Sequence, residues 1–174
     1  MMKKLFVSAG LVAALVCAAP AAWAQNQNTG GQAFLKKAIE GNLAEVEMGK
    51  LAQQKGNSDG VKSFGKTLEQ DHSNANQKAM SLAKDMGMTP PTEPNRKQKA
   101  DYNRLSKLSG DKFDREFARH MVTDHKQDIK EFQKEAKKTN ERPASFANDT
   151  LPTLQKHLDM AQQLEGKGKT TGSR

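Results

Sequence analysis

After its first 24 residues the chain has no cysteine and no tryptophan, because the single Cys17 and the single Trp23 both lie in that opening segment. A chain without cysteine forms no disulfide and has no thiolate to use as a nucleophile or metal ligand. Residues 25–174 therefore exclude a disulfide-stabilised miniprotein and all cysteine-dependent chemistry.

Large apolar side chains are also scarce. Leu, Ile, Val and Phe together number 22 in residues 25–174, and no run of them is long enough to span a bilayer. β-Branched residues are few, and the apolar residues recur at spacings of three and four, which is the period of an α-helix. The pattern excludes a transmembrane bundle and predicts amphipathic helices around a thin core.

The first 24 residues have the composition of a secretory signal peptide. Lys3 and Lys4 precede an apolar stretch from Leu5 to Ala19, and Ala22-Trp23-Ala24 supplies small residues at the positions recognised for cleavage. Val16 is too bulky for the residue before a lipoprotein cysteine. We therefore expect cleavage after Ala24 and export, most simply to the bacterial periplasm.

The mature chain is predicted to be an all-α, ferritin-like antiparallel four-helix bundle. Two helical hairpins are joined by a long crossover that contains Pro90, Pro91 and Pro94 and bears a short extra helix, the kind of connection a ferritin-like bundle uses. The expected helices span about 32–55, 58–85, 97–108, 109–138 and 144–165. The domain reading is a signal peptide at 1–24, a flexible leader at 25–31, the bundle at 32–165 and a basic disordered tail at 166–174.

Three of the four histidines fall on the apolar faces of their helices, at 100° per residue. They are His72, His125 and His157, one on each of three long helices, whereas His120 points elsewhere. Each lies near the middle of its helix, so the three share a level whichever way the helices run. We expect the rings to meet inside the bundle.

Imidazole and carboxylate ligands together suit Zn, Cu or Fe. The first long helix contributes Glu47 near mid-height, although Asn42 lies on its other apolar stripe and the sequence does not decide which stripe faces inward. The predicted metal ligands are His72, His125, His157 and Glu47, with Asp71, Asp124 and Asp128 around them. A buried hydrogen-bond network without metal is the alternative. Glu69 and His72 form one Glu-x-x-His unit, but the second unit of a di-iron bundle is missing.

The formal charge of +8 comes largely from lysines spread over solvent faces. Few aromatic residues are present for base stacking, so nucleic acid is not an expected partner. The basic tail with Lys167, Lys169 and Arg174 allows contact with an anionic envelope surface. The histidine cluster and the positive charge together leave three possible functions. The first is a non-catalytic binding or stress protein of the envelope with an interior histidine and carboxylate cluster that binds a transition metal. The second is a metal-dependent oxidase or peroxide-consuming enzyme, and the third is a cationic surface-interaction module with a purely structural polar core.

Several stretches resemble an exported bacterial family known as domain of unknown function 4142. They are Glu40-Gly41-Asn42-Leu43-Ala44-Glu45-Val46-Glu47-Met48-Gly49-Lys50-Leu51-Ala52, Val61-Lys62-Ser63-Phe64 leading to Asp71-His72, Phe113-Asp114, Met121-Val122-Thr123-Asp124-His125, and Thr150-Leu151-Pro152-Thr153-Leu154-Gln155-Lys156-His157-Leu158. The resemblance covers about residues 33–164. It implies a ferritin-like four-helix bundle and a periplasmic or outer-membrane address, and it implies no established reaction.

Overall fold

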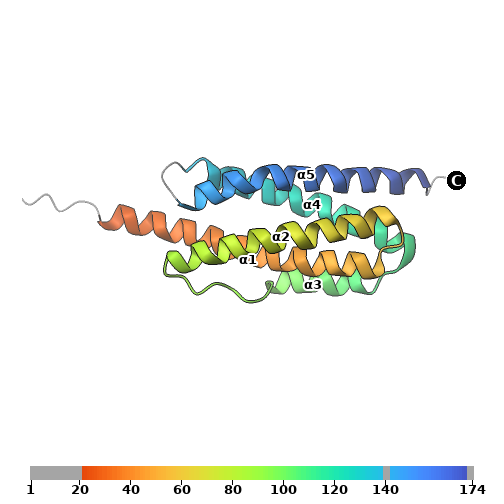
Figure 1. Ribbon diagram of the computed structural model, residues 1–174, viewed down its shortest axis with the longest axis horizontal. Helices are drawn as coiled ribbons and strands as arrows, with labels where there is room; N and C mark the ends of the chain where they lie inside the picture. The colour runs from red at the N-terminus through yellow and green to blue at the C-terminus, as the bar shows by residue number, and fades with distance from the viewer. Residues whose placement is uncertain (1–20, 139–141, 172–174) are drawn as a thin grey trace, which may run out of the picture.

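A computed structural model describes residues 21–138 and 142–171, and within these ranges the chain consists of five α-helices joined by turns and loops (Figure 1). The helices are α1 (Ala21–Lys55), α2 (Asp59–Asp85), α3 (Arg96–Ser106), α4 (Gly110–Ala136) and α5 (Arg142–Thr171). The all-α bundle predicted from the sequence is confirmed. None of the described helices combines the length and the apolar character needed to cross a membrane.

The four long helices form two hairpins that lie side by side. α1 packs along α2 and α4 packs along α5, while the hairpins meet through fewer contacts, mainly between α2 and α5 and between α1 and α4 (Figure 1). The short α3 lies against α1 as part of the crossover. The seam between α1 and α4 is therefore a thinly packed side of the bundle.

Local signals in the sequence set several helix ends. The hydroxyl of Ser58 accepts a hydrogen bond from the backbone N–H of Val61 and caps the start of α2. Asn95 and Gln98 form a reciprocal capping box at the start of α3. Gly87, with φ of 72°, follows the end of α2 in a conformation that favours glycine.

Two helices are longer than the sequence predicts. α1 begins at Ala21, so the expected loose leader at 25–31 and the predicted cleavage point after Ala24 both lie within it. α5 continues to Thr171 through most of the expected tail. Extending an existing helix costs little once a packed segment has formed its first turns, which explains the extra length. Residues 1–20 of the predicted signal peptide and residues 172–174 lie outside the described residues.

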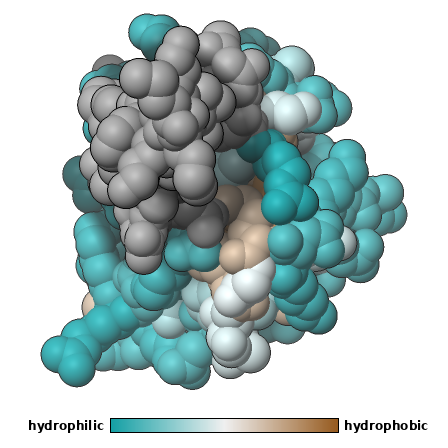
Figure 2. All heavy atoms as spheres, turned by 90° about the vertical axis from the view of Figure 1, so that its left-hand side faces the viewer, coloured by the Kyte–Doolittle hydropathy of each residue, from teal (hydrophilic) through white to brown (hydrophobic). Residues whose placement is uncertain are grey.

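Phenylalanines fill the core on both sides of a central polar level. Toward one end the rings of Phe34 and Phe132 meet edge to face with centroids 5.0 Å apart, and Phe146 packs against both. Toward the other end Phe113 stacks on Phe117 at 5.7 Å. Figure 2 shows a largely hydrophilic exterior at one end of the bundle, with an apolar strip in its middle. The two aromatic groups therefore flank the polar level with apolar side chains.

Two glycines let α1 and α2 approach each other closely. A Cβ on Gly49 would lie 2.5 Å from the carbonyl oxygen of Gly65, and a Cβ on Gly65 would lie 2.6 Å from that of Gly49. Asn42 lies two helical turns before Gly49, and His72 lies two turns after Gly65. Because the helices run antiparallel, this crossing point brings Asn42 and His72 face to face.

Candidate metal centre

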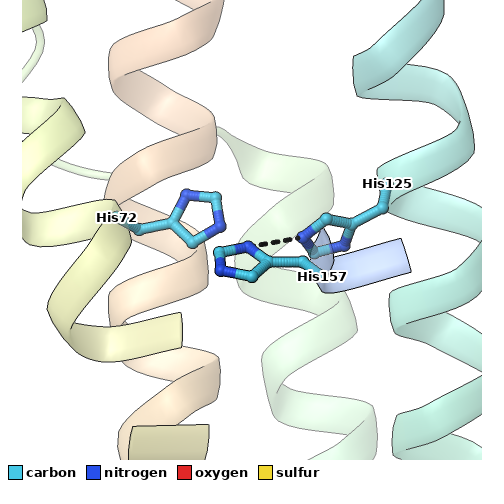
Figure 3. Close-up of side chains that lie close together, drawn as sticks. All are labelled: His72, His125 and His157. Atoms are coloured by element: carbon cyan, nitrogen blue, oxygen red, sulfur yellow. Dashed lines mark hydrogen bonds between the residues drawn. The ribbon is translucent and has the colours of Figure 1, made fainter. Parts of the chain in front are cut away.

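Three histidine rings meet at the central level of the bundle (Figure 3). His72 comes from α2, His125 from α4 and His157 from α5, and a nitrogen of each lies within 4.8 Å of a nitrogen of the others. Their side chains are buried, with 4%, 0% and 0% exposure respectively. The ring centroids are 5.2 to 5.8 Å apart. The three rings thus lie together, as the helical periodicity predicts.

Each ring uses one nitrogen to hold a hydrogen bond on its outer side. His125 Nδ1 donates to the carbonyl oxygen of Met121 at 3.0 Å, and His157 Nε2 donates to the Asp71 carboxylate at 2.9 Å. His72 Nδ1 donates to Asn42 Oδ1 at 2.9 Å. A backbone carbonyl and a carboxylate only accept, so the protons of neutral His125 and His157 lie on their outer nitrogens, and the Asn42 amide, which presents its Oδ1 to His72, places the proton of that ring on Nδ1.

The inner nitrogens therefore carry lone pairs. His125 Nε2 and His157 Nδ1 face each other at 3.4 Å, the contact dashed in Figure 3; with the protons of both neutral rings on their outer nitrogens, this contact joins two lone pairs rather than a donor and an acceptor. His72 Nε2 is buried without a hydrogen-bond partner, and Figure 3 shows the far nitrogen of its ring directed toward the other two. Three converging lone pairs without a donor form a site that a cation would complete.

Burial keeps the rings in the neutral form that binds metals. Desolvation, followed by the charge of His157, lowers the pKa of His125 to about 4. Burial and then the two neighbouring imidazoles lower the pKa of His72 well below its usual value. Burial also lowers the pKa of His157, although Asp71 opposes this effect. All three rings are uncharged at neutral pH, so a metal ion would displace no proton from them.

One pair of ring nitrogens already has the spacing that a small transition-metal ion needs, and the His72 nitrogen lies within 4.8 Å of both. Metal to nitrogen bonds of about 2.0 to 2.1 Å in a tetrahedral site put ligand nitrogens about 3.3 Å apart. His125 Nε2 and His157 Nδ1 are already at 3.4 Å. The outer hydrogen bonds to Asp71, Asn42 and a backbone carbonyl match those that orient metal-binding histidines.

A small cavity adjoins the cluster at His72. Its volume is about 20 Å³, and Asn42 and Asp128 also line it. A volume of this size holds one water molecule. The cavity would therefore let a water molecule lie on the His72 side of the cluster, and three protein ligands with one open position are the arrangement of many zinc sites.

The acidic residues predicted to lie at or around the metal differ in whether they reach the three histidine rings. Asp71 hydrogen-bonds His157, but Glu47 is exposed and does not join the rings, so Asn42 is the residue that α1 presents to them. The sequence leaves open whether Glu47 or Asn42 faces inward, because α1 has apolar residues on two sides. Among the described hydrogen bonds, Asp124 and Asp128 make none to the three rings.

Sequence reasoning missed Glu45. Its side chain is only 2% exposed and its Oε2 has no hydrogen-bond partner. Burial, followed by the charge and hydrogen bonding of Asp124 and the charge of Asp128, raises the pKa of Glu45 well above its usual value. Glu45 is one turn from Asn42, and that i, i+3 spacing would have shown that the two share a face.

His120 lies outside the cluster, as predicted, and is half-buried beside Arg119 and Asp101. The pKa of His120 is lowered, because the effect of burial exceeds the opposing effect of the Asp124 and Asp101 carboxylates. Because it sits on the same helix as His125, it serves as an internal control for tests of the cluster.

Comparison with known proteins identifies the family of the chain and gives no function. No curated protein and no solved structure matches it. One family model, described as a domain of unknown function, matches residues 17–164. The match covers all three histidines of the cluster and every residue that hydrogen-bonds them. The chain therefore belongs to the family of domain of unknown function DUF4142, as its sequence resemblance indicated.

Proposed function

We propose that this protein binds one transition-metal ion through His72, His125 and His157 and acts as a non-catalytic binding protein of the bacterial envelope. The observation that carries the proposal is the convergence of three buried imidazoles whose outer N–H groups are all held by acceptors. A satisfied core histidine has no reason to leave its second nitrogen facing another lone pair. The proposed location in the envelope rests on the sequence of residues 1–24, which resembles a signal peptide.

Neutral imidazoles suit Zn, Cu, Fe and Ni, and three of them with one open position favour Zn(II) or Cu(II). Glu69, the acid of the Glu-x-x-His unit, bonds Gln53 at 2.7 Å and lies 3.8 Å from Lys50, so it turns away from the rings. A di-iron centre would need carboxylates that bridge two ions. The arrangement therefore supports binding of a single ion over ferroxidase chemistry.

Thermal unfolding with added metal tests the proposal. The mature protein, freed of metal by chelation, is melted alone and with Zn(II), Cu(II), Ni(II) or Fe(II). A ligand at 100 times its Kd stabilises the native state by about 2.7 kcal/mol, which raises Tm by about 5 to 10 °C for a domain of this size. Isothermal titration should give one ion per chain.

The matched variants are His72→Ala, His125→Ala and His120→Ala. The first two should abolish the metal-dependent rise in Tm, and the third should keep it because His120 lies outside the cluster. The proposal is wrong if none of the four metals shifts Tm, or if the His120 variant loses the shift as fully as the other two.

A further inference from the structure

The cavity beside His72 lies in the seam between α1 and α4. Its wall is formed mainly by side chains of these two helices, with His72 and Leu154 closing it on the inner side. The complete lining is Phe34, Lys37, Ala38, Gly41, Asn42, His72, Asp128, Glu131, Phe132 and Leu154. It leads from a histidine of the cluster toward charged residues that reach solvent.

Negative charge gathers along the α4 side of this cavity. Asp128 and Glu131 are one turn apart on its wall, and no ion pair among the described residues contains Asp128. Burial, followed by the charges of Asp124 and Glu131, raises the pKa of Asp128 well above its usual value. The carboxylates of Asp124 and Glu131, which contribute to this shift after burial, make the local potential negative, and a cation drawn there would favour the ionised form of Asp128.

The outer end of the cavity is spanned by one ion pair. Lys37 of α1 donates to the carboxylate of Glu131 of α4 at 3.3 Å. The side chains are 66% and 36% exposed, so this ion pair is in contact with solvent and contributes little energy. A lysine at this position places a positive charge across the mouth of an otherwise acidic passage.

We propose that the seam cavity is the route by which a transition-metal cation reaches the three histidines, that Asp128 receives the ion on its way inward, and that the pair of Lys37 and Glu131 restrains entry. This inference rests on the proposed metal-binding function. It assigns to Asp128 and Lys37 a role in the rate of loading, while the histidines set the affinity.

The opposite side of the cluster offers a second groove but a less suitable route. A hollow of about 220 Å³ between α2 and α5 is lined by Asp71 and Asp149, among others. An ion arriving there would first meet Asp71 and behind it the N–H of His157, which carries no lone pair. The seam cavity instead is lined by His72 itself, whereas no histidine of the cluster lines the opposite groove and Lys78 adds a positive charge to it.

Stopped-flow binding of Co(II), followed by its absorption, separates the two routes. Asp128→Asn removes the carboxylate that would receive the ion and should slow association about tenfold. Lys37→Gln should accelerate association about twofold to threefold, because it removes a positive charge and frees the mouth. Asp149→Asn removes the same charge from the opposite groove and should leave the rate unchanged.

The Kd of the Asp128 and Lys37 variants should stay within about threefold of wild type, because a change on the route alters association and dissociation alike. Circular dichroism shows whether Asp128→Asn folds, and the exposed Lys37 variant tests the route independently. Equal rates in wild type and both seam variants, or slowing by Asp149→Asn alone, would overturn the route while leaving the metal site standing. Absence of Co(II) binding to wild type would overturn both.

Discussion

The crossing of α1 and α2 at Gly49 and Gly65 allows a test that joins stability to the site. In Gly49→Ala the added methyl group would lie 2.5 Å from the carbonyl oxygen of Gly65 and 2.8 Å from the backbone nitrogen of Glu69. Both atoms belong to the backbone of α2, so no side chain can move aside. The helices would have to separate by nearly 1 Å to restore ordinary contact distances.

Overpacking of this kind costs about 1 to 3 kcal/mol, whereas replacing glycine by alanine inside a helix gains about 1 kcal/mol. Gly41→Ala is the matched control, because its methyl group would meet only the flexible end of Gln98, at 4.0 Å. It lies in the same helix and has the same intrinsic gain. The difference in unfolding free energy between the two variants therefore measures the packing cost.

The crossing also holds Asn42 against His72. A separation of nearly 1 Å would lengthen their 2.9 Å hydrogen bond beyond effective range and release the ring that it orients. Loss of such an outer partner lowers metal affinity about 10-fold to 100-fold.

Urea unfolding with chelator present measures stability, and Co(II) titration measures affinity. We expect Gly49→Ala to be less stable than Gly41→Ala by about 1 to 3 kcal/mol and to bind metal more weakly. Equal stability of the two alanine variants would refute the close-approach argument, and equal affinity would show that the crossing does not position His72.

Three further perturbations address the charged groups. The folded-state pKa of His125, about 4, lies below its ordinary value of 6.5, so the stability it contributes is full above pH 6.5 and is lost as the pH falls toward 4. The loss is about 3 kcal/mol, and His125→Gln should flatten the pH dependence of metal-free urea unfolding; an unchanged slope contradicts this. The raised pKa of Glu45 has the opposite effect on the pH dependence: the contribution of Glu45 to the free energy of unfolding is full below its ordinary pKa and is lost as the pH rises. Glu45→Gln should therefore raise Tm at pH 8 more than at pH 5, and the reverse order would show that the carboxyl is not strained by burial. Asp71→Asn should weaken Co(II) binding about 10-fold to 100-fold in titrations, whereas exposed Asp159→Asn should not; equal affinities would exclude Asp71 as a positioning residue.

Helical periodicity in the sequence predicts the direction and the height of the three histidines of the site. α2, α4 and α5 each have a single apolar face, so the direction of His72, His125 and His157 follows from their spacing to residues such as Phe64 and Leu154. Their common height follows from their mid-helix positions. Capping residues such as Ser58 fixed the start of α2 to within a residue.

α1 shows where periodicity is insufficient. It has apolar residues on two sides, so its rotation about its own axis is not set by its sequence. The close approach at Gly49 settles the rotation, turning Asn42 and Glu45 inward and Glu47 to solvent. That contact depends on the backbone of α2, and no pattern within α1 could reveal it.

The amphipathic helices and the inward direction of the three imidazoles can be predicted from the amino-acid order, because both depend on the 3.6-residue period of one helix at a time. Which nitrogen of each ring faces its neighbours depends on the packing of the helices against one another. That choice depends on acceptors supplied in part by other helices, Asn42 for His72 and Asp71 for His157. A metal site is a relation between helices, so only their packing could turn three inward histidines into three converging lone pairs.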